Sequence, residues 1–115
     1  MKVSVQRVNE YQPIKSSTVI LVDRLWPRGV SKASLQNVEW IKDLAPSNEL
    51  RHWFHEDIAS RYKTFTKKYA IELANKESVL EEQLKKLKEP VILLTAVREL
   101  EMSHIPTLVS FLKKF

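Results

Sequence analysis

The alternation of hydrophobic and polar positions along the chain predicts three strands. A near-continuous apolar run covers 18–25 and a second covers 91–97. Such β-branched and aliphatic runs are typical of strands that are buried on both faces of a sheet. A weaker alternation over 2–8, with Val3 and Val5 on one side, predicts another strand. A loop that contains Pro13 follows it over 11–17.

Apolar residues at spacings of three and four predict helices in the rest of the chain. The clearest covers 57–73, where the apolar positions are Ile58, Tyr62, Phe65, Tyr69 and Leu73. Shorter helices are expected at 31–35, at 40–44 and at 48–54, the last of them capped by Ser47. The next helix ends at Pro90, and its buried stripe is formed by Val79, Leu80, Leu84 and Leu87. A final helix is expected over 103–114, with Pro106 in its first turn.

Strands that are buried on both faces need covering elements on each side of the sheet. The pattern therefore predicts a small three-layer α/β domain of residues 1–115, with a mostly parallel sheet and helices on both faces. The long helical segment between the strands at 18–25 and 91–97 allows a right-handed crossover, so these two strands should be parallel. The short link between 8 and 18 leaves the direction of the first strand open.

Composition adds a basic charge balance. The 115 residues include 19 Lys and Arg against 14 Asp and Glu, a formal net charge of +5. This balance favours an anionic partner, either a small molecule or a nucleic acid. Lysines on solvated helix faces explain the same total, so the charge alone does not decide between these interpretations.

Several chemistries are excluded or disfavoured by what the sequence lacks. Without cysteine there is no thiol nucleophile and no Cys-ligated metal, and a single glycine excludes the Gly-rich nucleotide loops. The apolar runs are far shorter than the roughly 20 residues of a membrane span, and the N-terminus has no signal-peptide core. We expect a soluble cytoplasmic protein with no membrane partner, metal or cofactor. The oligomeric state is not determined by the sequence.

One segment concentrates the candidate chemistry, namely Asp23-Arg24-Leu25-Trp26-Pro27-Arg28-Gly29. It follows a predicted buried strand and holds the only glycine of the chain. Gly29 is expected either to have a positive φ or to allow a close approach of something bound. Trp26 either stacks on a planar ligand or plugs the turn against the core.

Ligands of open α/β sheets bind beyond the carboxyl ends of the strands. Parallel strands would bring Arg24 and Arg98 to one edge, with Arg28 on the following turn, and Arg7 joins them if the first strand is parallel. One interpretation is an anion pocket, because guanidinium groups suit phosphate and carboxylate. The other is a structural network in which Arg24 pairs with Glu99 and Asp23 with Arg98.

Three residues near this edge are candidates for acid–base chemistry. Asp23 and Glu99 are candidate bases, and His104 follows in the same segment as Glu99. His52 and His55 lie three residues apart, a spacing that two metal ligands on one helix would share. Two histidines alone are a weak metal signal, so no metal site is assigned.

The segments 21–31 (Leu-Val-Asp-Arg-Leu-Trp-Pro-Arg-Gly-Val-Ser) and 44–54 (Leu-Ala-Pro-Ser-Asn-Glu-Leu-Arg-His-Trp-Phe) resemble the YeaO-like branch of the domain-of-unknown-function family 488. The resemblance covers essentially the whole chain and implies a small α/β domain. It implies site residues at matching positions, which are Asp23, Arg24, Trp26, Pro27, Arg28, Gly29, Arg51 and Trp53. It also leads us to expect an acid and two histidines after the last strand. Here Glu99 stands where an aspartate is expected, and Met102 stands where a histidine is expected.

The sequence therefore predicts a domain that binds an anionic small molecule in an Arg-rich pocket, and whether it is an enzyme stays open. The ligand-binding candidates are Arg24, Trp26, Arg28, Gly29, Arg51, Trp53 and Arg98, and the catalytic candidates are Asp23, Glu99 and His104. A nucleic-acid-binding module and a partner-binding module remain alternatives. The latter would use an exposed patch of Trp26, Trp53 and Phe54.

Overall fold

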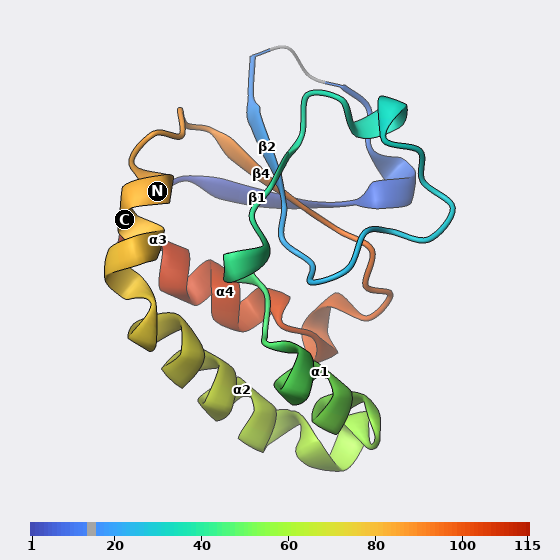
Figure 1. Cartoon of the computed structure of the whole chain (residues 1–115), viewed down its shortest axis with the longest axis vertical. Helices are drawn as coiled ribbons and strands as arrows, with labels where there is room; N and C mark the ends of the chain where they lie inside the picture. The colour runs from blue at the N-terminus through green and yellow to red at the C-terminus, as the bar shows by residue number, and fades with distance from the viewer. Residues whose placement is uncertain (14–15) are drawn as a thin grey trace.

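The computed structural model describes residues 1–13 and 16–115, so residues 14 and 15 of the predicted loop 11–17 lie outside the described residues. Four parallel strands form one sheet (Figure 1). Their spatial order is β1 (Val3–Arg7), β4 (Val91–Thr95), β2 (Thr18–Leu21) and β3 (Glu39–Trp40). The predicted α/β class and parallel sheet are confirmed.

The central strand β4 fixes the register of its two neighbours. Val91 lies opposite both Val3 of β1 and Thr18 of β2. The predicted parallel pairing of β2 with β4 is therefore confirmed. The first strand, whose direction was open, is parallel as well, which brings Arg7 to the same carboxyl-terminal edge as the ends of β2 and β4.

The short strand β3 replaces the beginning of a helix that the sequence predicts over 40–44. Glu39 and Trp40 pair with β2, and the main-chain N–H of Ile41 donates to the carbonyl of Leu21 at 3.1 Å. The helical part is a 3₁₀ turn, Lys42–Leu44. The prediction was wrong at Trp40 because pairing with β2 satisfies main-chain groups there that a helix would have used internally.

Four α-helices pack on one face of the sheet. They are α1 (Asn48–His55), α2 (Ile58–Asn75), α3 (Glu77–Leu84) and α4 (Ile105–Leu112). The predicted cap of α1 is confirmed, because Ser47 Oγ accepts from the N–H of Leu50 at 3.2 Å. The predicted buried stripe of α3 is wrong at Val79, which is 56% exposed while Leu80 and Leu84 are buried.

The opposite face of the sheet is covered by 3₁₀ turns and loops. Val19, Leu21, Ile92 and Leu94 of the strands form a second, smaller core with Leu35. Leu35 belongs to the 3₁₀ turn Ala33–Leu35, and a further 3₁₀ turn, Val8–Glu10, lies on the same side. The predicted three layers are thus present, and the helices of the third layer are short 3₁₀ turns.

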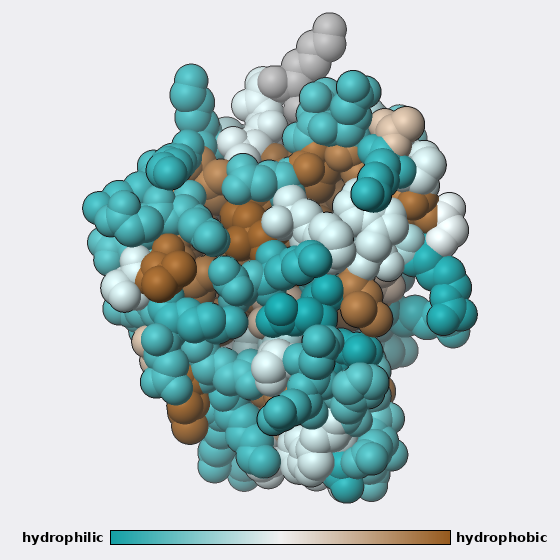
Figure 2. All heavy atoms as spheres, in the orientation of Figure 1, coloured by the Kyte–Doolittle hydropathy of each residue, from teal (hydrophilic) through white to brown (hydrophobic). Residues whose placement is uncertain are grey.

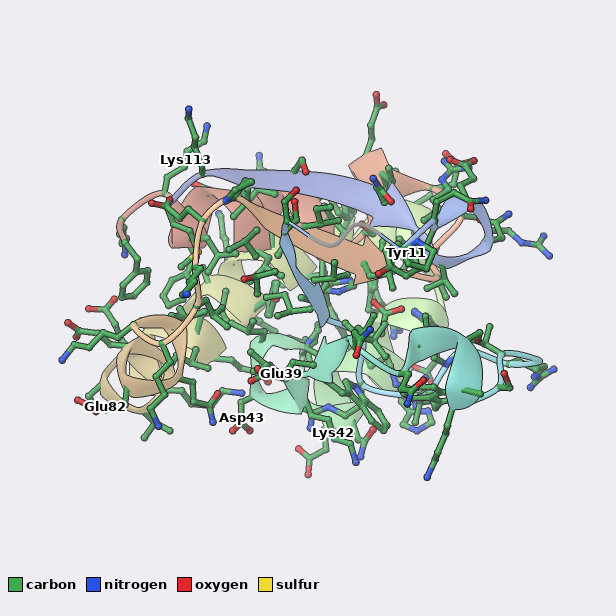
Figure 3. The ribbon with its side chains drawn as sticks, turned by 90° about the horizontal axis from the view of Figure 1, so that it is seen from above. Tyr11, Glu39, Lys42, Asp43, Glu82 and Lys113 are labelled. Atoms are coloured by element: carbon green, nitrogen blue, oxygen red, sulfur yellow. The ribbon has the colours of Figure 1, made fainter. Side chains whose placement is uncertain are left out.

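The two edge strands lie on opposite sides of the molecule. Figure 3 shows Glu39 and Lys42 on the β3 side and Lys113 on the other side, next to β1. Hydrophilic side chains cover most of the face in Figure 2, and hydrophobic ones form smaller patches between them. None of the helices in the described part of the chain has the length and apolar character needed to span a membrane.

Candidate functional site

Asp23, two residues after the end of β2, joins several segments at the carboxyl-terminal edge of the sheet. Its Oδ1 accepts from the hydroxyl of Thr95 at 2.6 Å, and its Oδ2 accepts from the main-chain N–H of Ala96 at 2.8 Å. The side chain is only 13% exposed. Asp23 thereby joins the end of β2 to the end of β4.

His104 completes this buried network from the entry of α4. Its Nε2 lies 3.0 Å from the carbonyl of Val22 and 3.3 Å from Asp23 Oδ1. Both neighbours are hydrogen-bond acceptors, so Nε2 is the nitrogen that carries the proton. His104 is 7% exposed, and its ring meets that of Tyr69 edge-on, with 6.0 Å between the centroids.

These contacts define what Asp23 and His104 do in the fold. Both carboxylate oxygens of Asp23 have internal donors, and the imidazole holds the entry of α4 against the end of β2. Glu99, the other candidate base, is exposed. The catalytic roles predicted for these three residues stay predictions.

Arg24 and Arg98 lie in different surroundings. The guanidinium of Arg24 donates to the carbonyls of Pro46 and Ala45 at 3.0 and 3.1 Å. Arg98 is exposed, and its carbonyl accepts from Arg7 at 2.8 Å. Arg24 therefore holds the segment before α1, whereas Arg98 lies beside β1.

The alternative ion-pair network is not formed. Among the residues that the structure describes, Arg24 and Arg98 make no ion pair with Asp23 or Glu99. Arg24 contacts main-chain carbonyls in place of Glu99. Asp23 contacts Thr95, Ala96 and His104 in place of Arg98.

The turn after β2 has a structural explanation. The indole N–H of Trp26 donates to the carbonyl of Val30 at 2.7 Å, and its ring packs edge-on against Trp40 with centroids 5.4 Å apart. Trp26 thereby plugs the second face of the sheet. Gly29 has a φ of 77°, and a Cβ built there would meet nothing within 4 Å. The positive φ, rather than a close approach, explains this glycine, while Arg28 is exposed.

Helix α1 carries a second group of basic side chains. The Nε of Arg51 is buried and has no hydrogen-bond partner among the described residues, and its Nη2 lies 3.4 Å from His52 Nε2. Burial lowers the pKa of His55, and the nearby charges of Arg51, His52 and His104 lower it further. Basic side chains of α1 and of the entry of α4 thus lie close together around His55.

The aromatic residues of α1 do not form the exposed patch that the partner-binding alternative requires. Phe54 is buried, and it stacks on Phe65 with 4.0 Å between the centroids. Trp53 is half-buried between two cations, with Arg61 at 4.8 Å and Lys68 at 4.3 Å from the centroid of its ring. In the part of the chain that the structure describes, no three His, Asp or Glu side chains are arranged to hold a metal ion.

Two buried side chains that hold this region together are not among the sequence-based candidates. Thr95 is fully buried, and its hydroxyl lies at the end of the apolar strand β4. A polar residue that ends an apolar run is the sequence feature that would have identified it. Tyr69 was assigned to the core, yet its hydroxyl donates to the carbonyl of Leu44. Burial raises the pKa of Tyr69 well above the usual value, and the negative charges of Glu72 and Asp23 raise it further.

Two hollows of about 480 and 500 Å³ lie away from this edge. The first lies between α2 and α4, and the second lies between β3 and α3. Neither is lined by Arg24, Arg28, Arg51 or Arg98. A ligand at the arginines would therefore bind outside these two hollows.

Comparison with known proteins places the chain in a family. It is 38% identical over 120 residues to the uncharacterized protein YeaO of Escherichia coli strain K12, and the match covers 98% of each chain. It is 36% identical over 113 residues to the uncharacterized protein Rv3073c of Mycobacterium tuberculosis strain H37Rv, covering 96% of this chain and 93% of the relative. No solved structure matches. The family model described as the inactive DUF488-N3 subclade matches residues 2–115, and the chain therefore belongs to this DUF488-N3i family.

Proposed function

We propose that this protein is a binding domain for a small molecule that bears a phosphate or a carboxylate. The anion would bind at the surface between α1 and the entry of α4. The observation that carries the proposal is Arg51, whose buried Nε has no acceptor among the described residues. A buried guanidinium N–H without an acceptor is costly, and an anion bound against the guanidinium would supply the missing acceptor once a small movement of the side chain uncovers the Nε.

The surroundings of Arg51 support an anion as the ligand. The pKa of His55 is lowered by burial and then by the nearby basic side chains of Arg51, His52 and His104. A bound anion would relieve this repulsion and favour the protonated form of His55. Planar guanidinium and imidazole donors suit the oxygens of phosphate and carboxylate.

The residues after β2 would then support the site rather than contact the ligand. Arg24 donates to the carbonyls of Ala45 and Pro46, directly before Ser47, which caps α1. Arg24 thereby sets the position of α1, and α1 carries Arg51 and His55. In this proposal Arg24 is a positioning residue for the anion site.

Two observations favour binding over catalysis. The family model that matches the chain is described as an inactive subclade. Asp23, the better-placed of the two candidate bases, already accepts hydrogen bonds at both carboxylate oxygens. A base with both oxygens engaged is poorly placed to remove a proton from a ligand.

Thermal unfolding in the presence of inorganic phosphate tests the proposal, with sodium chloride at equal ionic strength as the reference. A ligand at ten times its Kd stabilises the native state by about 1.4 kcal/mol, or about 6 °C for a chain of 115 residues. Arg51→Gln should abolish this rise. Arg28→Gln removes the same charge from an exposed side chain, and this variant should still show the rise of the midpoint with phosphate.

Acetate in place of phosphate identifies which anion the site prefers. If neither anion raises the midpoint of the wild-type protein, the proposal is wrong. It is equally wrong if Arg28→Gln loses the rise as fully as Arg51→Gln, because the effect would then reflect overall charge alone.

A further inference from the structure

A groove on the outer side of the helical layer is separate from the anion site. It lies between α2 and α4, which run beside each other in Figure 1, and it encloses about 480 Å³. Its floor is apolar and includes Tyr62, Leu73 and Phe111.

The shape of the groove suits a helix. Small side chains line it on both sides, with Ala70 and Ala74 from α2 and Thr107 and Ser110 from α4. Small residues let two helix axes approach to within about 8–10 Å. Along α2 the lining extends from Tyr62 to Ala74, which at about 1.5 Å per residue is roughly 18 Å, or about three helical turns.

The charges of the groove select an acidic occupant. Lys67 and Lys114 are the charged residues of its lining, and no carboxylate is among the lining residues. Lys114 also forms an ion pair with Glu77 at 3.7 Å, and such an exposed pair is weak enough to exchange for an acidic partner. Lys114 also lies 5.5 Å from the centroid of the Phe111 ring, so its ammonium group stays near the apolar floor. A second copy of this chain would carry the same net charge of +5 and would be repelled.

We propose that this groove binds an amphipathic helix of a partner protein, whose apolar face packs on the floor and whose acidic flanks meet Lys67 and Lys114. This is the helix-in-groove mode of recognition, in which apolar anchors at spacings of three and four supply the contact. The charged rim adds selectivity for acidic over basic helices.

Two synthetic peptides of about 15 residues, a length at which a helix forms readily on binding, serve as probes. Both carry leucines at spacings of three and four on one face, flanked by glutamates in one peptide and by lysines in the other. We expect isothermal titration to give a Kd on the order of 10 μM for the glutamate peptide and binding at least about tenfold weaker for the lysine peptide.

Two variants differ only in whether they enter the groove. Ala70 is exposed and lines the groove, so Ala70→Arg fills it without disturbing the core. Ile71 is the next residue, is 60% exposed and does not line it, so Ile71→Arg adds the same charge outside. Ala70→Arg should weaken the glutamate peptide at least about tenfold, and Ile71→Arg should leave its Kd within about twofold. Lys67→Glu should reverse the preference between the two peptides.

The proposal is overturned if neither peptide binds, if both bind equally, or if Ala70→Arg binds the glutamate peptide as well as Ile71→Arg does. Unchanged thermal midpoints of the variants show that the fold is intact. Arg51→Gln should bind the glutamate peptide like the wild type, so failure of the anion proposal and failure of this one are distinguishable.

Discussion

Asp23→Asn is the substitution that most directly examines the network at the carboxyl-terminal edge. Asp23 receives hydrogen bonds from the Thr95 hydroxyl and the Ala96 N–H, and His104 Nε2 lies 3.3 Å from its Oδ1. Asparagine keeps the shape of the side chain but replaces one acceptor oxygen by an NH₂ group. Turned one way, this group faces the N–H of Ala96, and turned the other way it faces the N–H of His104. Either orientation sets two donors against each other.

The expected loss follows from these contacts. A buried donor left without an acceptor costs about 1–3 kcal/mol, and the remaining hydrogen bonds lose the contribution of the charged carboxylate. Because Asp23 is only 13% exposed, water cannot replace the missing acceptor fully. We expect the free energy of unfolding to fall by about 2–4 kcal/mol, or the thermal midpoint to fall by about 8–16 °C for 115 residues.

Urea unfolding followed by far-ultraviolet circular dichroism measures this loss. Glu99→Gln is the matched control, because it also removes a carboxylate charge near the end of β4, but from an exposed side chain. It should change the free energy of unfolding by less than about 0.5 kcal/mol. A loss in Asp23→Asn no larger than in Glu99→Gln would refute the assignment of Asp23 as the link between β2, β4 and α4. The double variant with Thr95→Val should lose less than the sum of the single variants.

Three further substitutions test other parts of the structure. Gln83→Met removes a buried carboxamide oxygen that has no partner among the described residues. It should raise the free energy of unfolding by about 1 kcal/mol and therefore raise the urea midpoint. A lower midpoint would contradict this. Gly29→Ala places a Cβ at a φ of 77° and should cost about 1–2 kcal/mol in the same assay, whereas no loss would mean that the turn relaxes. The native pKa of His55 lies below its ordinary 6.5, so the unfolded chain binds more protons near pH 6. Stability should therefore fall as the pH drops below about 6.5, and His55→Gln should lose less over pH 7 to 5. Parallel profiles of the two proteins would exclude His55 as a cause.

The sequence predicts the central strands and the long helices because their patterns are periodic and local. The apolar run of β4 needs cover on both faces, and the spacing of Phe65, Tyr69 and Leu73 needs a helix. In contrast, β3 is only two residues long and carries no alternation. It is a strand because its main chain pairs with β2. The local sequence around Glu39 and Trp40 contains no pattern that predicts this pairing.

The second face of the sheet was harder to predict for a related reason. Trp26, Val30 and Leu35 cover it, and they follow no helical or strand spacing. Their packing depends on tertiary contacts, such as the edge-on approach of Trp26 to Trp40. Irregular cover of this kind leaves no period in the sequence, so α-helices were the natural expectation for a strand buried on both sides.

In the candidate site, likewise, the order of the strands predicts which segments meet but not which groups form hydrogen bonds there. The rule that parallel strands end at one edge brings Asp23 beside residues 95 and 96, although 72 positions separate Asp23 from Thr95. The rule does not say which donors Asp23 finds there. The main-chain carbonyls of Ala45 and Pro46, which hold Arg24, have no side-chain signature at all. A dense cluster of charged residues in a sequence therefore marks where segments are joined as readily as where a ligand binds.

The segment after β2 illustrates why these two roles are easily confused. Asp23 joins two strands to α4, Arg24 holds the start of α1, and Trp26 closes the second face. The polar groups of these side chains form their hydrogen bonds within the protein. Arg51, one turn into α1, instead has a buried N–H with no acceptor among the described residues. Arg51, the residue best suited to a ligand, thus lies on a different segment from the residues that organise the edge. Those residues set the position of the helix that carries Arg51.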